Sequence, residues 1–174
     1  MEKLKKIQKL GLIVTWRLLY LGLCDKQISS EEIIEFAVEQ LEKGCDVSEV
    51  CMLAASCSNE KEEICCLLQK LINHEETSND IEMRKLRVVV VASAIEKKQE
   101  NYIDGLVGLT DLWIELGCPE DSPHVVQGRN NNLTVGEYYT AENYSRLFQQ
   151  HQDWLIRELL LFKKNDKNLY SLEF

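Results

Sequence analysis

The stretch SSEEIIEFAVEQLEKG, residues 29–44, carries a complete set of helix signals and predicts how this chain folds. Ser29 precedes the apolar pattern and Glu32 follows three residues later, which is the spacing of a capping box at a helix N-terminus. Gly44 follows the pattern, and glycine commonly ends helices because it accepts a left-handed backbone. One apolar face at helical spacing lies between these signals, formed by Ile33, Ile34, Ala37, Val38 and Leu41. The stretch therefore predicts an amphipathic helix with defined ends.

Helical patterns of similar length lie on both sides of this stretch. Thr15 opens one before it, Asp46 and Asn59 are candidate caps for two after it, and Thr140 opens a long last one. The chain has only two prolines and eight glycines, which favours long helices over many turn-punctuated strands. We therefore predict an all-α fold. Residues 1–174 form a single domain of about six to seven helices, packed as an irregular bundle or a helical-repeat-like array.

Four consecutive valines, Val88–Val91, are the one segment with strand propensity. A helical face is also present there, because Leu86, Val89 and Val90 recur at helical spacing. The sequence contains no second comparable strand, and a lone strand would leave its backbone unpaired. Helix is favoured over strand, and both alternatives stay open.

A long irregular loop is predicted around residues 117–139. Gly117 and Pro119 end the preceding helix, which spans Tyr102–Leu116, and the tripeptide Asn130–Asn132 is typical of a polar excursion. The loop is longer than a connection between helices requires, which suggests contact with a partner or variation within a family.

The charge of the chain limits its partners. The formal net charge is −9, and residues 25–82 alone hold 15 acidic and four basic residues. Phosphate groups would be repelled, so we expect neither nucleic acid nor an anionic membrane as the direct partner. The charge favours a basic protein as the partner. Nothing in the sequence predicts the oligomeric state.

The compartment is predicted from the cysteines and from the lack of a membrane segment. Seven cysteines without a C-x-x-C pair are typical of reduced thiols, which we expect at apolar helix positions in the core. No segment approaches the roughly 20 uncharged apolar residues of a membrane span. We therefore expect a cytoplasmic protein.

No arrangement of residues points to catalysis, a metal or a cofactor. The three histidines, His74, His124 and His151, are far apart in the sequence and none belongs to an H-E-x-x-H motif. Phosphate-binding glycine motifs and the nucleophile elbow of serine hydrolases are also absent. Cys118 and His124 are the one cysteine–histidine pair within a predicted loop, and a nucleophilic role for them is the enzymatic alternative.

An acidic stripe on the helix of residues 29–44 is the predicted partner-binding surface. Glu32, Glu35, Glu39 and Glu42 are three, four and three residues apart, which places them within about 80° of one another around the helix. Phe36 flanks this arc and could serve as an apolar anchor. A solvated face that keeps the protein soluble is the alternative interpretation.

The chain also resembles an uncharacterised bacterial domain family that includes immunity proteins of LXG-type toxin–immunity modules. Three segments carry the resemblance: VTWRLLYLGLCDKQISSEEIIEFAVEQLEKG at residues 14–44, LTDLWIELGCPED at residues 109–121, and a C-terminal helix that contains Trp154. The matching positions are Trp16, Gly117, Pro119, Glu120, Asp121 and Trp154. The chain departs from the family after the Pro-Glu-Asp turn, where it has VVQGRNNN.

This resemblance implies a protein that inhibits by binding: a small cytoplasmic immunity or antitoxin-like protein that covers the active surface of a cognate toxin. It implies no catalysis and no cofactor. A helical adaptor or regulatory scaffold without a toxin partner is the second hypothesis, and a neighbouring toxin gene would distinguish the two.

Overall fold

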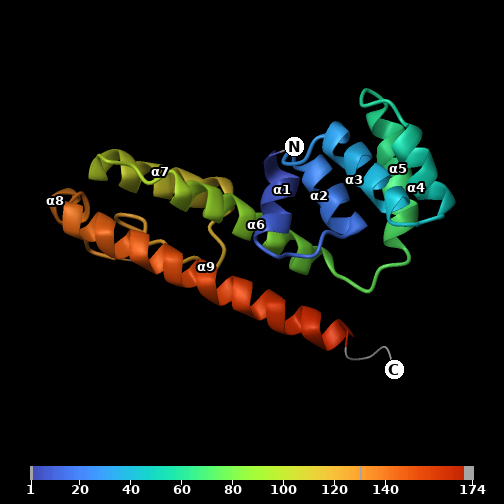
Figure 1. Cartoon of the computed structure of the whole chain (residues 1–174). Coiled ribbons are helices and arrows are strands. Elements are labelled where there is room, and N and C mark those ends of the chain that lie inside the picture. The colour runs from blue at the N-terminus through green and yellow to red at the C-terminus, as the bar shows by residue number, and fades with distance from the viewer. Residues whose placement is uncertain (1, 130, 171–174) are drawn as a thin grey trace. The chain divides into compact units, whose positions relative to one another are not determined.

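The computed structural model describes residues 2–129 and 131–170, and side chains within residues 3–129 and 131–163. Within those residues the chain forms nine helices and no strand, which confirms the all-α prediction (Figure 1). The number exceeds the predicted six to seven. The helices are α1 Glu2–Lys9, α2 Trp16–Cys24, α3 Ser30–Glu42, α4 Ser48–Ala55, α5 Lys61–Ile72, α6 Asn79–Glu96, α7 Tyr102–Glu115, α8 Val135–Tyr138 and α9 Ala141–Tyr170.

Contacts along the chain divide it into two compact units. Unit 1 spans Met1–Val89 and unit 2 spans Val90–Phe174, so the boundary falls inside α6. Whether the two units act as one domain, as the sequence predicts, stays a prediction.

Helix α3 has the ends that its sequence predicts. The Ser29 hydroxyl accepts a hydrogen bond from the Glu32 amide at 3.3 Å, and the Glu32 carboxylate accepts one from the Ser29 amide at 3.1 Å. At the other end Gly44 adopts φ +93°, and the amides of Gly44 and Cys45 donate to the carbonyls of Leu41 and Gln40. This pair of bonds is a Schellman motif, so both helix termini are stabilised by local residues.

Unit 1 has its core where α2 packs against α5 and where α4 packs against α3 and α5. The apolar face of α5 is buried in full, comprising Ile64, Leu67, Leu68, Leu71 and Ile72. Across the same unit, the rings of Trp16 and Phe36 meet edge to face with centroids 5.2 Å apart. These contacts tie α2 to α3, the next helix in the chain, and to α5, which is distant in sequence.

The segment before α6 does more than connect two helices. The Glu75 carboxylate accepts hydrogen bonds from the amides of Trp16 and Arg17, at 2.6 and 2.9 Å, and so satisfies donors at the start of α2. Burial raises the pKa of the Glu75 carboxyl despite these two bonds. A carboxylate 59 residues away therefore completes a cap that Thr15, which accepts from the Leu18 amide, begins.

The valine run belongs to a helix, as the sequence favoured. Val88–Val91 lie within α6, and Val88, Val89 and Val91 are all buried. The predicted face was too narrow, because Val88 and Val91 point to other sides of the helix than Leu86 and Val89. One turn earlier, Lys85 pairs with the fully buried Glu82 at 3.2 Å and donates to the Ile13 carbonyl.

Two predicted caps are wrong. The N-cap of α4 is Val47 rather than Asp46, and that of α5 is Glu60 rather than Asn59, and neither makes a side-chain capping bond. The Glu60 carboxylate instead accepts from the Cys57 amide at 2.7 Å. The residue types of a capping box therefore do not by themselves position the N-cap, since both helices begin one residue later than the pattern predicts.

The cysteines are not the core residues that the sequence predicted. All seven are free thiols. Cys24, Cys51, Cys57 and Cys66 are exposed, and Cys45, Cys65 and Cys118 are half-buried. Larger apolar residues on the same helices occupy the interior in their place. Within the described residues, no helix is both long and apolar enough to cross a membrane.

Unit 2 is built on α7 and α9, which pack against each other (Figure 1). Its core gathers Leu106, Leu109, Tyr138, Tyr144, Leu147 and Phe148. Gly105 on α7 allows the close approach of α9, because a Cβ added there would lie 2.5 Å from the Tyr144 ring. Tyr144 is also held by its hydroxyl, which accepts from the Gln99 amide and donates to the Gln99 carbonyl. Gly108, also on α7, makes no such approach, because a Cβ added there would meet no atom within 4 Å.

The two glycines of α7 make a matched pair for a stability test. We expect Gly105→Ala to lower the free energy of unfolding by about 2 kcal/mol, because the new methyl group overlaps the Tyr144 ring, which is buried and hydrogen-bonded to Gln99. Gly108→Ala meets no atom within 4 Å and should raise stability by about 0.5–1 kcal/mol through helix propensity. Urea denaturation followed by circular dichroism measures both. Equal effects of the two substitutions would contradict the packing role of Gly105.

Candidate functional site

Only part of the acidic stripe of α3 is exposed to solvent. Glu35, Glu39 and Glu42 are exposed, as predicted for partner-binding residues. One of them has a neighbouring cation, because Lys43 lies 3.8 Å from Glu39 and both side chains are largely exposed. Such an exposed pair contributes little energy and leaves Glu39 accessible.

Two of the predicted surface residues lie in the interior instead. Glu32 is 6% exposed, and its carboxylate joins the Ser29 amide to the Leu4 amide, which donates to it at 3.2 Å. Phe36 is 8% exposed and packs against Trp16. The prediction that Phe36 is available as an exposed anchor is therefore wrong, and Glu32 serves to join α1 to α3.

The structure places a different apolar residue beside the exposed acids. Val38 is 40% exposed, although the sequence assigned it to the core face. At about 100° per residue, Val38, Glu35, Glu39 and Glu42 fall within an arc of about 100° around α3. We call these four residues the acidic face. The face combines three carboxylates with one accessible apolar side chain.

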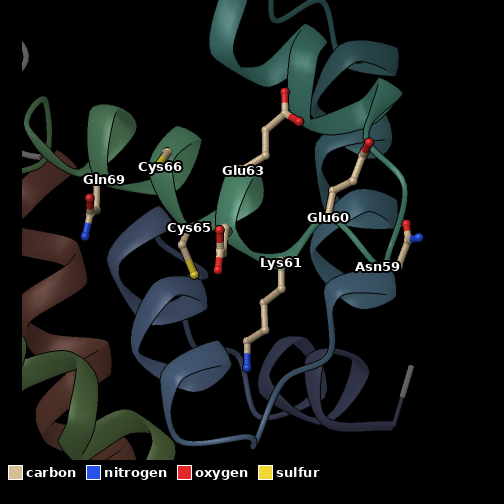
Figure 2. A pocket seen from close by; sticks show the side chains of 8 residues that line it. Asn59, Glu60, Lys61, Glu63, Cys65, Cys66 and Gln69 are labelled. Carbon is tan, nitrogen blue, oxygen red and sulfur yellow. The ribbon is translucent and has the colours of Figure 1, made fainter.

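A shallow surface pocket of about 870 Å³ lies on α5 and the turn before it. Figure 2 shows that its side chains diverge rather than converge on a common point. Burial raises the pKa of the Cys65 thiol there, which opposes formation of a reactive thiolate. Within the described residues no group of three or more His, Cys, Asp or Glu side chains could hold a metal ion. This pocket offers no organised chemistry.

The loop of residues 117–139 contains more structure than the sequence suggested. It includes helix α8, which begins with a capping box between Thr134 and Glu137. Both Gly117 and Cys118 adopt positive φ, at +77° and +47°, so the chain turns sharply after α7. Residues 122–127 are half-buried rather than a solvated excursion. The loop therefore folds against the helices of unit 2.

This fold creates a pocket of about 410 Å³ in unit 2, which we call the loop pocket. It is lined by Trp113, Cys118, Pro119, Glu120, Ser122, His124, Val125, Val126, Arg129 and Asn131. One lining residue, His124, meets a histidine 27 positions away in sequence, since the rings of His124 and His151 have centroids 5.5 Å apart. No pattern in the sequence predicts that these two rings meet.

The hydrogen bonds of His151 determine its tautomer. Trp113 donates its indole Nε1–H to His151 Nε2 at 2.7 Å, so Nε2 is an acceptor. His151 Nδ1 lies 2.6 Å from the Leu147 carbonyl and must carry the proton. The ring is fully buried, and burial lowers its pKa. His151 is therefore a neutral, fully hydrogen-bonded core residue.

The hydrogen bonds of His124 determine the opposite tautomer. Thr110 Oγ1 lies 2.9 Å from His124 Nε2, but its single proton goes to the Leu106 carbonyl. Tyr138 likewise donates to the Val125 carbonyl, and its oxygen lies 3.4 Å from His124 Nε2. His124 Nε2 must therefore carry the proton, and Nδ1 has an unshared electron pair.

That electron pair has no hydrogen-bond partner. His124 Nδ1 is buried and accepts no bond from any described residue, Cys118 included. The cysteine–histidine pair that the sequence raised lines one pocket but is not joined by a hydrogen bond. Burial, with a smaller contribution from His151, lowers the pKa of His124 to about 4, so the ring is neutral at physiological pH.

Sequence reasoning missed the loop pocket because its parts come from separate segments. Trp113, the loop and His151 are brought together only by the packing of α7 with α9. One local signal was present, since His151 occupies an apolar position of the last helix, where a buried histidine needs a partner.

One of three comparisons with known proteins finds a match, which is to a protein family. The model of a family described as an uncharacterised protein conserved in bacteria, DUF2247, matches residues 4–159. No curated protein and no solved structure matches the chain. The match begins within α1 and ends within α9, so it includes all of α2 to α8.

The neutral state of His124 predicts a dependence of stability on pH. The unfolded ring binds a proton near its usual pKa of 6.5, whereas the folded ring stays neutral down to about pH 4. Acidification between these values therefore favours the unfolded state. We expect the free energy of unfolding to fall by about 1 kcal/mol between pH 7 and pH 5 from this ring, allowing for partial solvent access.

Comparison with variants isolates this contribution from that of the carboxylates. In His124→Gln, the fall in the free energy of unfolding between pH 7 and pH 5 should be smaller than in the wild type by about 1 kcal/mol. His74→Gln is the matched control, because it makes the same substitution at an exposed histidine of unit 1. Denaturation curves at both pH values measure the difference. An unaltered pH dependence in His124→Gln would show that the folded ring titrates normally.

Proposed function

The chain belongs to the bacterial family DUF2247, and from that premise we propose that it is an immunity or antitoxin-like protein. It binds a cognate toxin directly through the acidic face of α3. It acts in the cytoplasm, without catalysis and without a cofactor. The observation that carries the proposal is the set of exposed carboxylates Glu35, Glu39 and Glu42 around the exposed Val38.

The charge of the surrounding chain supports a basic partner. Residues 25–82, which hold α3 to α5, contain 15 acidic and four basic residues. Such a concentration of one sign speeds the association of an oppositely charged protein and disfavours partners of the same sign. Many nucleic-acid-cleaving toxins have basic active surfaces, and an acidic inhibitor can occupy such a surface in place of the phosphate backbone.

The way α3 is held in unit 1 also supports a binding role. Its N-terminus is closed by the capping box, its C-terminus by the Schellman motif, and Phe36 packs its inner side against Trp16. The carboxylates therefore stand on a backbone that loses little entropy on binding. Val38 supplies the apolar contact that the sequence analysis assigned to Phe36, with the acids around it.

We further propose that the cognate toxin is of the LXG type and is encoded next to this protein. It rests on the resemblance of residues 14–44 and 109–121 to immunity proteins of such modules. An adaptor or scaffold without a toxin partner is the alternative. Co-expression with the product of the adjacent gene separates the two, since an immunity protein restores growth and a scaffold does not.

A double charge reversal tests the acidic face. We expect Glu35→Lys with Glu39→Lys to weaken binding of the adjacent gene product by about 10- to 100-fold and to reduce the dependence of Kd on salt. The matched control is Asp111→Lys with Glu115→Lys, which has the same spacing and charge change on exposed positions of α7. Titration calorimetry at several salt concentrations measures both. Equal losses in the two variants would indicate a general effect of net charge and contradict a specific interface.

A further inference from the structure

We propose that the loop pocket of unit 2 is a binding site for a small organic acid that carries a neutral hydroxyl or amide N–H donor. The donor binds His124 Nδ1, the body of the ligand packs against the apolar wall, and its carboxylate meets Arg129. This site is separate from the acidic face of α3 and does not depend on the proposed function.

The unpaired acceptor of His124, a residue of the pocket lining, is the first reason. The bonds of Thr110 and Tyr138 require the proton of His124 on Nε2 and leave the electron pair on Nδ1. That nitrogen is buried and has no partner among the described residues. Buried polar atoms of this kind are uncommon, and an unmet acceptor beside a pocket is explained by a ligand or water that donates to it.

The charge of the ring selects the kind of donor. A neutral imidazole offers an electron pair, so it binds an O–H or N–H group and does not attract an anion at that point. The low pKa of His124, caused chiefly by burial, keeps this acceptor available over the physiological range. An ammonium group is also disfavoured, because no buried carboxylate lines the pocket to compensate its charge.

The remaining wall suits an apolar body of small size. Trp113, Pro119, Val125 and Val126 line the pocket. Its volume of about 410 Å³ is in the range of pockets for small molecules. The wall is also well supported, because Asn131 ties the loop together by donating to the Val126 and Arg129 carbonyls at 2.8 Å each.

Arg129 supplies the anion-binding end. It lines the pocket and is exposed, and its guanidinium has no hydrogen bond or ion pair with any described side chain. Guanidinium groups bind carboxylates through two parallel hydrogen bonds. Glu120 is the one acidic residue of the lining, and it lies exposed at the surface, so it penalises ligands with a second negative charge.

The experiment uses three probes of one shape on the full chain: 4-hydroxybenzoate, 4-methoxybenzoate and 4-hydroxybenzamide. The methoxy compound lacks the donor and the amide lacks the negative charge. Nitrogen-15 NMR of the histidine rings reports directly on Nδ1. We expect 4-hydroxybenzoate to bind with a Kd of about 1 mM, as befits a probe of this size, and to shift the Nδ1 resonance of His124 toward lower frequency.

The other probes and two variants identify the contacts. We expect 4-methoxybenzoate to bind about tenfold more weakly, since it cannot donate to Nδ1. His124→Phe should abolish the preference for the hydroxyl compound, and Arg129→Gln should abolish the preference for the acid over the amide. His74→Phe is the matched control at an exposed histidine of unit 1 and should change neither preference.

The wild-type spectra decide the outcome even if a variant fails to fold. The proposal is overturned if none of the probes moves the His124 resonances at about 10 mM. It is also overturned if the methoxy and hydroxyl compounds bind equally, which would mean that water alone satisfies Nδ1. Loss of toxin binding in the double charge reversal of α3 has no bearing on this result, so the two proposals fail separately.

Discussion

Polar groups that enter the interior of a helical protein must replace their hydrogen bonds to water with hydrogen bonds to the chain, and both units are organised around this requirement. In unit 1 the buried carboxylate of Glu32 joins the Ser29 and Leu4 amides, and Glu75 caps the start of α2. In unit 2 the buried ring of His151 joins Trp113 to the Leu147 carbonyl. Each link connects parts of the chain that helix formation alone would leave independent.

The same requirement distinguishes the two candidate binding regions. The acidic face of α3 consists of side chains left in water, because the inward positions of this helix are taken by Ile33, Phe36, Ala37 and Glu32. The acidic face therefore presents negative charges on a helix whose two ends are capped. The loop pocket has the opposite character, since one of its lining residues, His124, holds a buried atom without a hydrogen-bond partner. One region suits a protein surface of opposite charge, and the other suits a small molecule.

Much of the fold could be predicted because its signals are local. A capping box acts over three residues and a glycine stop over two or three, so Ser29 and Gly44 specify the ends of α3 in any context. The caps predicted at Asp46 and Asn59 failed for the same reason, since a shift of one residue in the backbone removes the geometry. The spacing of the glutamates on α3 was visible in the sequence, but the burial of Glu32 and Phe36 was not. The loop pocket could not be foreseen, because Trp113, His124 and His151 interact only after α7 and α9 have packed.

The sequence by itself determined that the chain is helical, where α3 begins and ends, and that its charge is concentrated in residues 25–82. These properties follow from backbone preferences and residue types, which act within a few positions. Only the tertiary structure decided which side of α3 faces water, so that Phe36 lies inside and Val38 outside. It also decided that His151 is satisfied while His124 keeps a free electron pair. The reason is that burial and long-range hydrogen bonds depend on which neighbours cover a residue, and helical periodicity alone does not specify them.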